Sequence, residues 1–417
     1  MSFQEDFLKK PYRVHSLLFV LFIIAGFFYA PPMVIFEGLF EIFTGVDILI
    51  SDYIYTGGFG AALVNVGLTG LLVAGALVHA KHEPVGLTMG TFGLTMGLAF
   101  FGKNPINMLP ILVGGFLYSK YAQLPNAKCV LRAVLATCLA PAVTLVAYAT
   151  DLPVAVSVII GAVIGLLIGF LINPLAIHMA AAHKGYNLYN VGWTAGIIAM
   201  GVFSLFTLFG VDYELKENWS YGYTPHLTIL LAAVSLYFIL CGALTKIEKV
   251  PFWDFFKFHK FDLDYFVLFK EKSYIHMGIL GIACLLFMLA VGGEYNGPVI
   301  GVIISVVGFG AFGKALFSSA PIIAGAMLAA VVSHFLTGMD VTGSGVLVAA
   351  FFSTCLAPMA KRFGFGWGVA AGFLHLSFAT NIAPFHGGLN LYNNGFAGGL
   401  TALILVPIIL FLRREEE

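Results

Sequence analysis

Residues 386–396 read HGGLNLYNNGF, and residues 183–193 read HKGYNLYNVGW. Each copy places a His, at least two Asn, a Tyr and two or more Gly within eleven residues, and a mostly apolar run follows each copy. The chain therefore contains one unit written twice. In each unit, a cluster of polar side chains stands at the beginning of an apolar segment long enough to cross a membrane.

The overall composition is that of an integral membrane protein. Of the 417 residues, 60% are hydrophobic and only 10% are charged, and the mean hydropathy is +0.95. Soluble domains carry about 25% charged residues. Lys and Arg together number 21, as do Asp and Glu, so nothing in the charge balance points to nucleic acid as a partner. The expected partners are the lipid bilayer and a small-molecule solute, and a homo-oligomer is compatible with the sequence.

The cysteines and known motifs give no sign of a metal, a cofactor or a catalytic centre. The number of cysteines is odd, they lie in or beside apolar runs, and they lack metal-ligand spacing; they are Cys129, Cys138, Cys241, Cys284 and Cys355. The sequence contains no P-loop, no dinucleotide-binding glycine pattern and no zinc-protease motif. We expect no disulfide, no metal site, no cofactor and no catalytic residue.

Apolar runs of about 17 to 25 residues predict transmembrane helices. Seven such runs lie in each half, which predicts an all-α polytopic membrane protein with one repeat at residues 1–215 and a second at 216–417. The fourteen runs are 14–36, 55–79, 84–101, 104–119, 128–149, 152–180, 187–211, 225–245, 276–293, 298–314, 315–333, 340–358, 364–381 and 389–411.

The remainder of the two halves also repeats. At a constant offset of 211 (278 − 67), eight Gly, Lys and Pro residues of the first half recur in the second; they are Gly67, Gly70, Gly90, Gly97, Gly102, Lys103, Pro110 and Gly114. Further on, Thr-Cys-Leu-Ala-Pro at 137–141 recurs at 354–358. A proline in this position predicts a kink in the helix that carries it.

The placement of charges predicts how the halves are oriented, because cytoplasmic loops are enriched in Lys and Arg. If all fourteen runs cross and the N-terminus is inside, most basic residues face the cytoplasm, including six lysines between 246 and 272. If the Pro-containing runs 104–119 and 315–333 only dipped into the membrane, those lysines would lie outside. Crossing is therefore favoured. Since seven is odd, the halves form an inverted repeat in the cytoplasmic membrane, with both termini cytoplasmic.

Two further segments complete this topology. Residues 14–36 are too long for the core of a signal peptide and lack a cleavage site, so they are expected to remain as the first span. Residues 246–275 mix Lys with Phe, Trp and Tyr, which predicts an amphipathic segment at the membrane interface.

The repeated motif supplies the candidate substrate-binding residues. Unpaired amides and phenols are costly in hydrocarbon, so these side chains must face protein or water. They suit a small polar, uncharged solute, because they offer both donors and acceptors. The alternative is an interhelical hydrogen-bond clamp with glycines at close helix contacts. The residues are Asn187, Tyr189, Asn190, Asn390, Tyr392 and Asn393.

Four basic side chains extend this candidate site. His183 and His386 begin the two motifs. Their expected role is to sense protons or bind the ligand, and the alternative is that they cap helices. Lys103 and Lys314 each open a short proline-containing helix, and we interpret them as basic gates at two entrances, or as side chains that snorkel to the interface. Asn65 has His276 as its counterpart, a polar position that the two halves use differently.

Two resemblances fit this pattern. The doubled His-x-Gly-x-Asn-Leu-Tyr-Asn, with Phe-Gly-Lys before a proline-broken helix, resembles a family of bacterial multi-pass membrane proteins recorded as a domain of unknown function. More distantly, a Pro-led, Gly-rich helix at Pro84–Gly102 and Pro298–Gly313, followed by Leu-Tyr-Asn-x-Gly, is similar to the urea-transporter pattern. That second resemblance implies inverted halves and a small neutral permeant. Of that family's Leu-Pro-x-x-Thr-x-Pro-Phe signature, only Ala383-Pro384-Phe385 is present.

The sequence thus predicts a membrane transporter or channel for a small polar, uncharged solute that passes between the two halves. Carboxylates are scarce inside the predicted spans, which favours passive transport or coupling through His. The alternative is a membrane-embedded enzyme or sensor that uses His183 and His386. A transporter should bring the two Asn-Leu-Tyr-Asn motifs together near the middle of the membrane. An enzyme should place one of these histidines beside an acid or a lysine, in a pocket open to one side only.

Overall fold

A computed structural model describes residues 10–245 and 264–414, except 151, 212 and 216. Every regular element in these residues is a helix, and β-pairing is limited to two isolated bridges. The expected all-α class is therefore confirmed. Most of the predicted amphipathic segment, residues 246–263, lies outside the described part.

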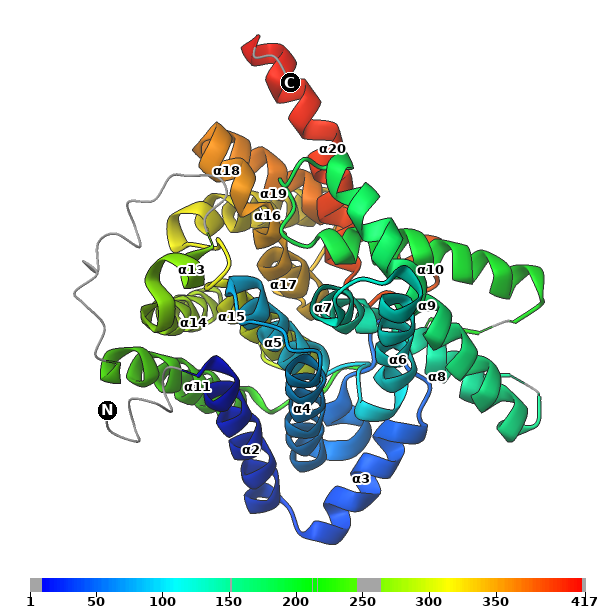
Figure 1. Ribbon diagram of the computed structural model, residues 1–417. Coiled ribbons are helices and arrows are strands. Elements are labelled where there is room, and N and C mark those ends of the chain that lie inside the picture. Colours follow the sequence, from blue (N-terminus) through cyan, green and yellow to red (C-terminus); the bar gives the residue numbers. More distant parts are fainter. Residues whose placement is uncertain (1–9, 151, 212, 216, 246–263, 415–417) are drawn as a thin grey trace.

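The helices of the two halves follow one another in corresponding order (Figure 1). The first half contains α2 (Pro11–Tyr29), α3 (Pro32–Thr44), α4 (Tyr53–His79), α5 (Gly86–Leu98), α6 (Pro105–Ala122), α7 (Asn126–Ala136), η1 (Thr137–Leu139), α8 (Pro141–Tyr148), α9 (Val154–Ala182) and α10 (Asn190–Leu208). The second half contains α11 (Thr224–Leu244), α13 (Tyr265–Phe269), η2 (Lys270–Lys272), α14 (Ser273–Val291), α15 (Gly297–Phe309), α16 (Leu316–Thr337), α17 (Ser344–Phe352), η3 (Ser353–Leu356), α18 (Ala357–Phe363), α19 (Phe365–Ala379), η4 (Ala383–His386) and α20 (Asn393–Arg413).

The number of membrane-crossing helices differs from the prediction. Nine helical stretches of the described chain are long and apolar enough to cross, and a tenth if the segments on either side of the 50° bend at Pro141 are counted together. The runs at 84–101 and 298–314 form α5 and α15, with 13 residues each. At 1.5 Å per residue they span about 20 Å, less than the hydrocarbon core of about 30 Å. These two runs are therefore not full crossings.

Proline and glycine explain where the predicted runs break. The run at 14–36 divides into α2 and α3, because Pro31 and Pro32 interrupt it and start the second helix. After α5 and α15 the chain unwinds, and Gly102 and Gly313 adopt φ values of +74° and +80°, which disfavour other residues. The kink expected at Pro141 is confirmed by the bend of 50° there, whereas the equivalent stretch Ser344–Phe363, which contains Pro358, forms one candidate span without such a bend.

The short helices α5 and α15 lie against each other in the centre of the molecule (Figure 1). A Cβ atom on Gly93 would lie 2.7 Å from the Cα of Gly308, and Gly97 similarly meets Gly301. Since the residue numbers rise along one helix as they fall along the other, the pair is antiparallel. All residues of α15 and all but Leu87 of α5 are buried, so these two helices form the core rather than a lipid-facing surface.

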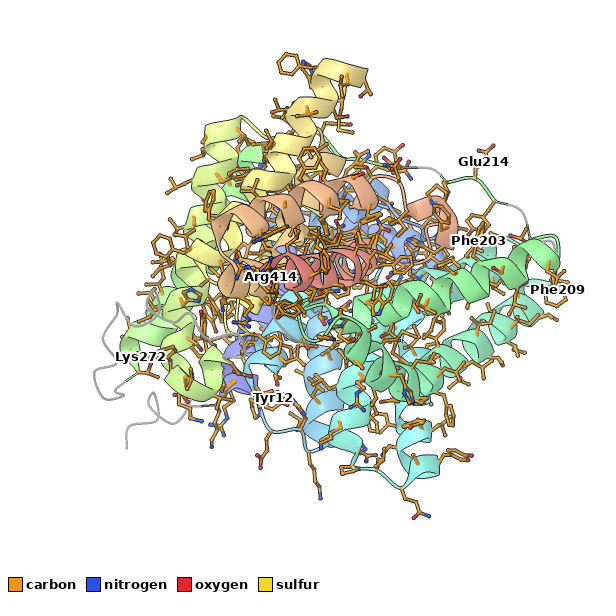
Figure 2. All side chains as sticks on the ribbon, turned by 90° about the horizontal axis from the view of Figure 1, so that it is seen from above. Tyr12, Phe203, Phe209, Glu214, Lys272 and Arg414 are labelled. Atoms are coloured by element: carbon orange, nitrogen blue, oxygen red, sulfur yellow. The ribbon has the colours of Figure 1, made fainter. Side chains whose placement is uncertain are left out.

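Apolar side chains face outwards from the long peripheral helices. Phe209, at the outer end of α10, is 75% exposed, and Figure 2 shows it at the edge of the molecule. Other strongly exposed apolar residues lie on separate helices; they include Phe28, Phe335 and Phe411. Large exposed apolar areas are rare on soluble monomers, and here they are the surface that contacts lipid. The chain is therefore a helical multi-pass membrane protein.

Candidate functional site

The two motif copies have the same internal hydrogen bonds. In the first, His183 Nε2 is 2.9 Å from Asn190 Oδ1, and in the second, His386 Nε2 is 2.8 Å from Asn393 Oδ1. Each of these Asn side chains also donates its amide to a carbonyl at or near the end of the preceding long helix, that of Ala176 or Ala379. The His and second Asn of each motif therefore fix the turn into the next helix.

The first Asn of each motif joins the two copies to each other. Asn187 Nδ2 donates to the carbonyl of Gly395 over 2.9 Å, and Asn390 Nδ2 donates to the carbonyl of Gly192 over 3.4 Å. Both side chains are buried. The two bonds are reciprocal, because each connects one motif's Asn to the same position of the other motif. The expected meeting of the two motifs is observed, and these contacts provide the interhelical clamp that was the alternative interpretation.

The tyrosines of the two motifs meet at the point where α10 and α20 begin. The ring centroids of Tyr189 and Tyr392 are 4.4 Å apart, and each side chain is 1% exposed. Beside them, Gly192 and Gly395 are in close contact, and a Cβ on Gly192 would lie 3.0 Å from the Cα of Gly395. Glycine at both positions allows the helix starts to approach closely enough for the rings to touch.

Lys314 lies behind this tyrosine pair. Its Nζ donates to the Tyr189 hydroxyl and, over 2.6 Å, to Thr354 Oγ1, and it lies 4.5 Å from the centroid of the Tyr189 ring. The equivalent Lys103 lies near Cys138, as Lys314 lies near Cys355. The two lysines are 0% and 1% exposed. The expectation that they stand at two entrances is therefore wrong, because the short helices that precede them end in the interior.

Asn65 and His276 support the unwound segments that carry the lysines. Asn65 Nδ2 donates to the carbonyls of Ala99 and Lys103 over 2.8 and 2.9 Å. His276 Nδ1 is 2.8 Å from the carbonyl of Gly310, which corresponds to Ala99. The two halves therefore use different residues for the same task, which is to satisfy carbonyls that the end of a short helix leaves unpaired.

One cavity, which we call cavity A, reaches the tyrosine pair from outside. Its volume is about 490 Å³, and Lys128 and Arg132 lie along it while Tyr189 and Tyr392 form its inner end. Cavity A also contacts His82, three residues beyond the C-terminal end of α4. Candidate residues of the first motif lie along its wall; they are His183, Asn187 and Asn190.

A second cavity, cavity B, is lined by the corresponding residues of the other half. Its volume is about 340 Å³. The corresponding residues of cavity B are Gly345, Val348, Ala349, Ala379, Ala383 and Asn393, which match Lys128, Leu131, Arg132, Ala176, Ala180 and Asn190 of cavity A. Cavity B also contacts Leu49 and Ile50, just before the N-terminal end of α4. Since the part of α4 that follows the kink at Gly58 is alone about 30 Å long, the two cavities lie at opposite ends of that helix.

Two polar atoms along cavity A lack hydrogen-bond partners of normal geometry among the described residues. They are the hydroxyl of Tyr392 and Nδ1 of His183. The Tyr392 hydroxyl interacts with that of Tyr189 without a well-formed bond. Buried polar groups are almost always paired, so these two atoms along the cavity are available to water or to a ligand.

The side chains of the two motif histidines are held by asparagines of their own motifs. Within the described residues, the side chains of His183 and His386 bond to Asn190 and Asn393, not to an acid or a lysine. Burial lowers the pKa of His183, and the hydrogen bond that its Nε2 donates to Asn190 Oδ1 opposes this only in part, so the neutral ring predominates at pH 7. The arrangement therefore supports a positioning role for both rings.

Two aspartates that the sequence analysis did not single out connect the halves. Asp52 in the first half accepts a bond from the backbone N–H of Gly297 at the start of α15, and Asp264 in the second accepts from Gly86 at the start of α5. The signal in the sequence is an Asp directly before an apolar helix, where it caps that helix. That signal does not identify the second helix, in the other half, to which each Asp also bonds.

Comparison with known proteins places the chain in a family. No curated protein and no solved structure matches it. A family model described as a protein of unknown function (DUF1576) matches residues 31–208 and 259–411, most of the chain and parts of both halves. The chain therefore belongs to the DUF1576 family of proteins of unknown function.

Proposed function

We propose that the protein is a membrane transporter that carries a small polar solute through a central site between two oppositely oriented halves. The observation that carries this proposal is the pair of equivalent cavities. Cavities A and B lie at opposite ends of α4, are lined by corresponding residues, and point towards the interface of the two motifs. Such a pair is what alternating exposure of one site to two sides requires.

The contacts between the halves support an inverted repeat. The equivalent helices α5 and α15 run antiparallel through close glycine contacts. The bonds that Asn187 and Asn390 make across the interface are reciprocal, as are those of Asp52 and Asp264. Reciprocal contacts between corresponding residues are the mark of a two-fold axis. If α5 and α15 run roughly along the membrane normal, such an axis lies in the membrane plane, which supports the proposed opposite orientations of the halves.

The cavities are unequal, which indicates a conformation open on one side. Cavity A reaches Tyr189 and Tyr392, whereas cavity B ends at Asn393 and Asn394. Lys128, Arg132 and the exposed Lys184 lie at the cavity A side. Because basic residues concentrate on the cytoplasmic face, we assign this side to the cytoplasm. The expectation that both termini are cytoplasmic would place them on the same side. The central site is thus open inwards and closed outwards.

The dimensions and polar groups of cavity A suit a small solute. Its volume of about 490 Å³ lies in the range of small-molecule sites. The Tyr392 hydroxyl and the His183 ring supply polar atoms that a solute can pair with. A transporter accounts for these features better than an open channel, because the tyrosine pair closes the route beyond cavity A.

Solute flux tests the proposal. Full-length protein in proteoliposomes is mixed with a panel of small solutes that contains neutral members (urea, glycerol, lactamide) and charged ones (lactate, ethanolamine), and uptake is followed over time. Leu131→Trp fills cavity A and should lower the uptake of the transported solute at least tenfold. Leu208→Trp is the matched control, because Leu208 is 74% exposed on the outer surface. Equal uptake in empty liposomes for every solute would overturn the proposal.

A further inference from the structure

We infer that the transported solute is a small organic carboxylate, held by the hydroxyls of Tyr189 and Tyr392 in front of Lys314. This inference rests on the proposed transporter function and replaces the uncharged solute that the motif alone suggested. Four observations lead to it: an ammonium without a counter-ion, two hydroxyl donors at the inner end of cavity A, apolar walls with a basic entrance, and a second, equivalent lysine.

Among the described residues, neither Lys314 nor Lys103 has a carboxylate partner. Lys314 contacts the hydroxyls of Tyr189 and Thr354, and its other titratable neighbours are Cys284, Cys355 and His375. None of these is an anion in its ordinary state. An ammonium inside a membrane protein normally pairs with an acid or faces a substrate path. A solute that carries a negative charge supplies the missing counter-ion when it reaches the end of cavity A.

The hydrogen-bond directions leave donors facing the cavity. The Tyr189 oxygen accepts a bond from Lys314, so its own proton is available for another acceptor. The Tyr392 hydroxyl interacts with that of Tyr189 without a well-formed bond, and it also lies along cavity A. Two phenol donors, one polarised by an ammonium behind it, match the two oxygens of a carboxylate.

The remainder of cavity A selects an organic monoanion. Its walls include Leu131, Leu135 and Phe309, which suit a short apolar body. A single ammonium backs the tyrosines, so one negative charge is balanced. Among the described residues along the cavity, Asp264 is the one carboxylate, and its oxygens already accept bonds from backbone N–H groups at two helix starts.

The entrances of cavities A and B carry opposite charges, which favours entry of an anion from one side. Lys128 and Arg132 of cavity A correspond to Gly345 and Ala349 of cavity B, and cavity B contains Glu217 and Asp340 instead. An anion is therefore attracted to the cytoplasmic entrance and repelled at the other. At the opposite side, Lys103 is the counterpart of Lys314, with Tyr392 and Thr137 in the positions of Tyr189 and Thr354.

Binding to the purified full-length protein in detergent tests the inference at pH 7. The probes are acetate, lactate, pyruvate and benzoate, each compared by calorimetry with its own neutral amide. At least one acid should bind ten times more tightly than its amide. Lys314→Met should weaken that acid at least tenfold. Tyr392→Phe should weaken it severalfold without a change in melting temperature, because the hydroxyl it removes has no well-formed bond.

Lys272→Met is the matched control, because it also removes one lysine charge. The Lys272 ammonium donates to the carbonyls of Gly242 and Thr245, and Lys272 does not line cavity A. The affinity of the Lys272→Met variant for the acid should equal that of the native chain. If every amide binds as tightly as its acid, or if Lys314→Met and Tyr392→Phe both keep full affinity, the carboxylate inference is overturned. Proteoliposome uptake of an amide but of no acid would overturn the inference and leave the transporter intact, whereas uptake of neither class overturns both.

Discussion

The reciprocal Asn bonds make a quantitative prediction about the interface of the two motifs. In Asn187→Ala, the Gly395 carbonyl loses its donor at 2.9 Å and the Tyr189 backbone N–H loses its acceptor at 2.9 Å. Each unpaired buried group costs roughly 1–3 kcal/mol. Asn187→Ala should therefore lower the free energy of unfolding by about 2–5 kcal/mol.

The equivalent change in the other motif should cost less. Asn390 accepts from the Tyr392 N–H over 3.0 Å, but its own donor bond to Gly192 is 3.4 Å long. Since the second bond is weak, Asn390→Ala should cost about 1–3 kcal/mol. The two motifs share the sequence Asn-Leu-Tyr-Asn, so a difference between these variants reports on the tertiary surroundings of each Asn.

Thermal and denaturant unfolding in detergent micelles measure both variants. Asn381→Ala is the control, because Asn381 is exposed and bonds only within its own turn, and its cost should stay within about 0.5 kcal/mol. The double variant should cost less than the sum of the single ones, because either change loosens the same junction of α10 and α20. If Asn187→Ala costs no more than the control, or less than Asn390→Ala, the clamp does not hold the halves together as described.

Two further predictions concern groups outside the motifs. Burial raises the pKa of Asp47 to about 7, and bonds from Tyr53, Thr144 and Asn107 only partly oppose it. A raised pKa in the folded state means that stability falls as the pH rises from about 4 to about 7. Melting curves between pH 5 and 8 should show this loss in the native chain and a flatter profile in Asp47→Asn. Gly308→Ala should destabilise the protein by about 1–3 kcal/mol, because its Cβ would lie 2.7 Å from Gly93 Cα. Gly201→Ala, in open space on α10, should be neutral or stabilising by up to about 1 kcal/mol, and equal melting temperatures for the two variants would contradict the close packing of α5 and α15.

The sequence by itself determined the class of protein and the repeated unit. Hydropathy identifies segments that avoid water, so the helical membrane class followed from composition, and the break at Pro141 followed from the geometry of proline. The prediction that the two Asn-Leu-Tyr-Asn motifs meet also came from the sequence. Polar groups that no lipid can solvate must find partners, and another copy of the same motif supplies them.

The tertiary structure decided what covers each apolar run. Hydropathy cannot distinguish a helix that faces lipid from one that is enclosed by protein, because both are apolar on all sides. For that reason α5 and α15 were predicted as full crossings, and Lys103 and Lys314, which follow them, were placed at the membrane boundary instead of the interior. The partners of Asp52 and Asp264, and the cavities themselves, depend on contacts between residues distant in the chain. No local pattern of residues specifies such contacts, because packing of the whole chain selects them.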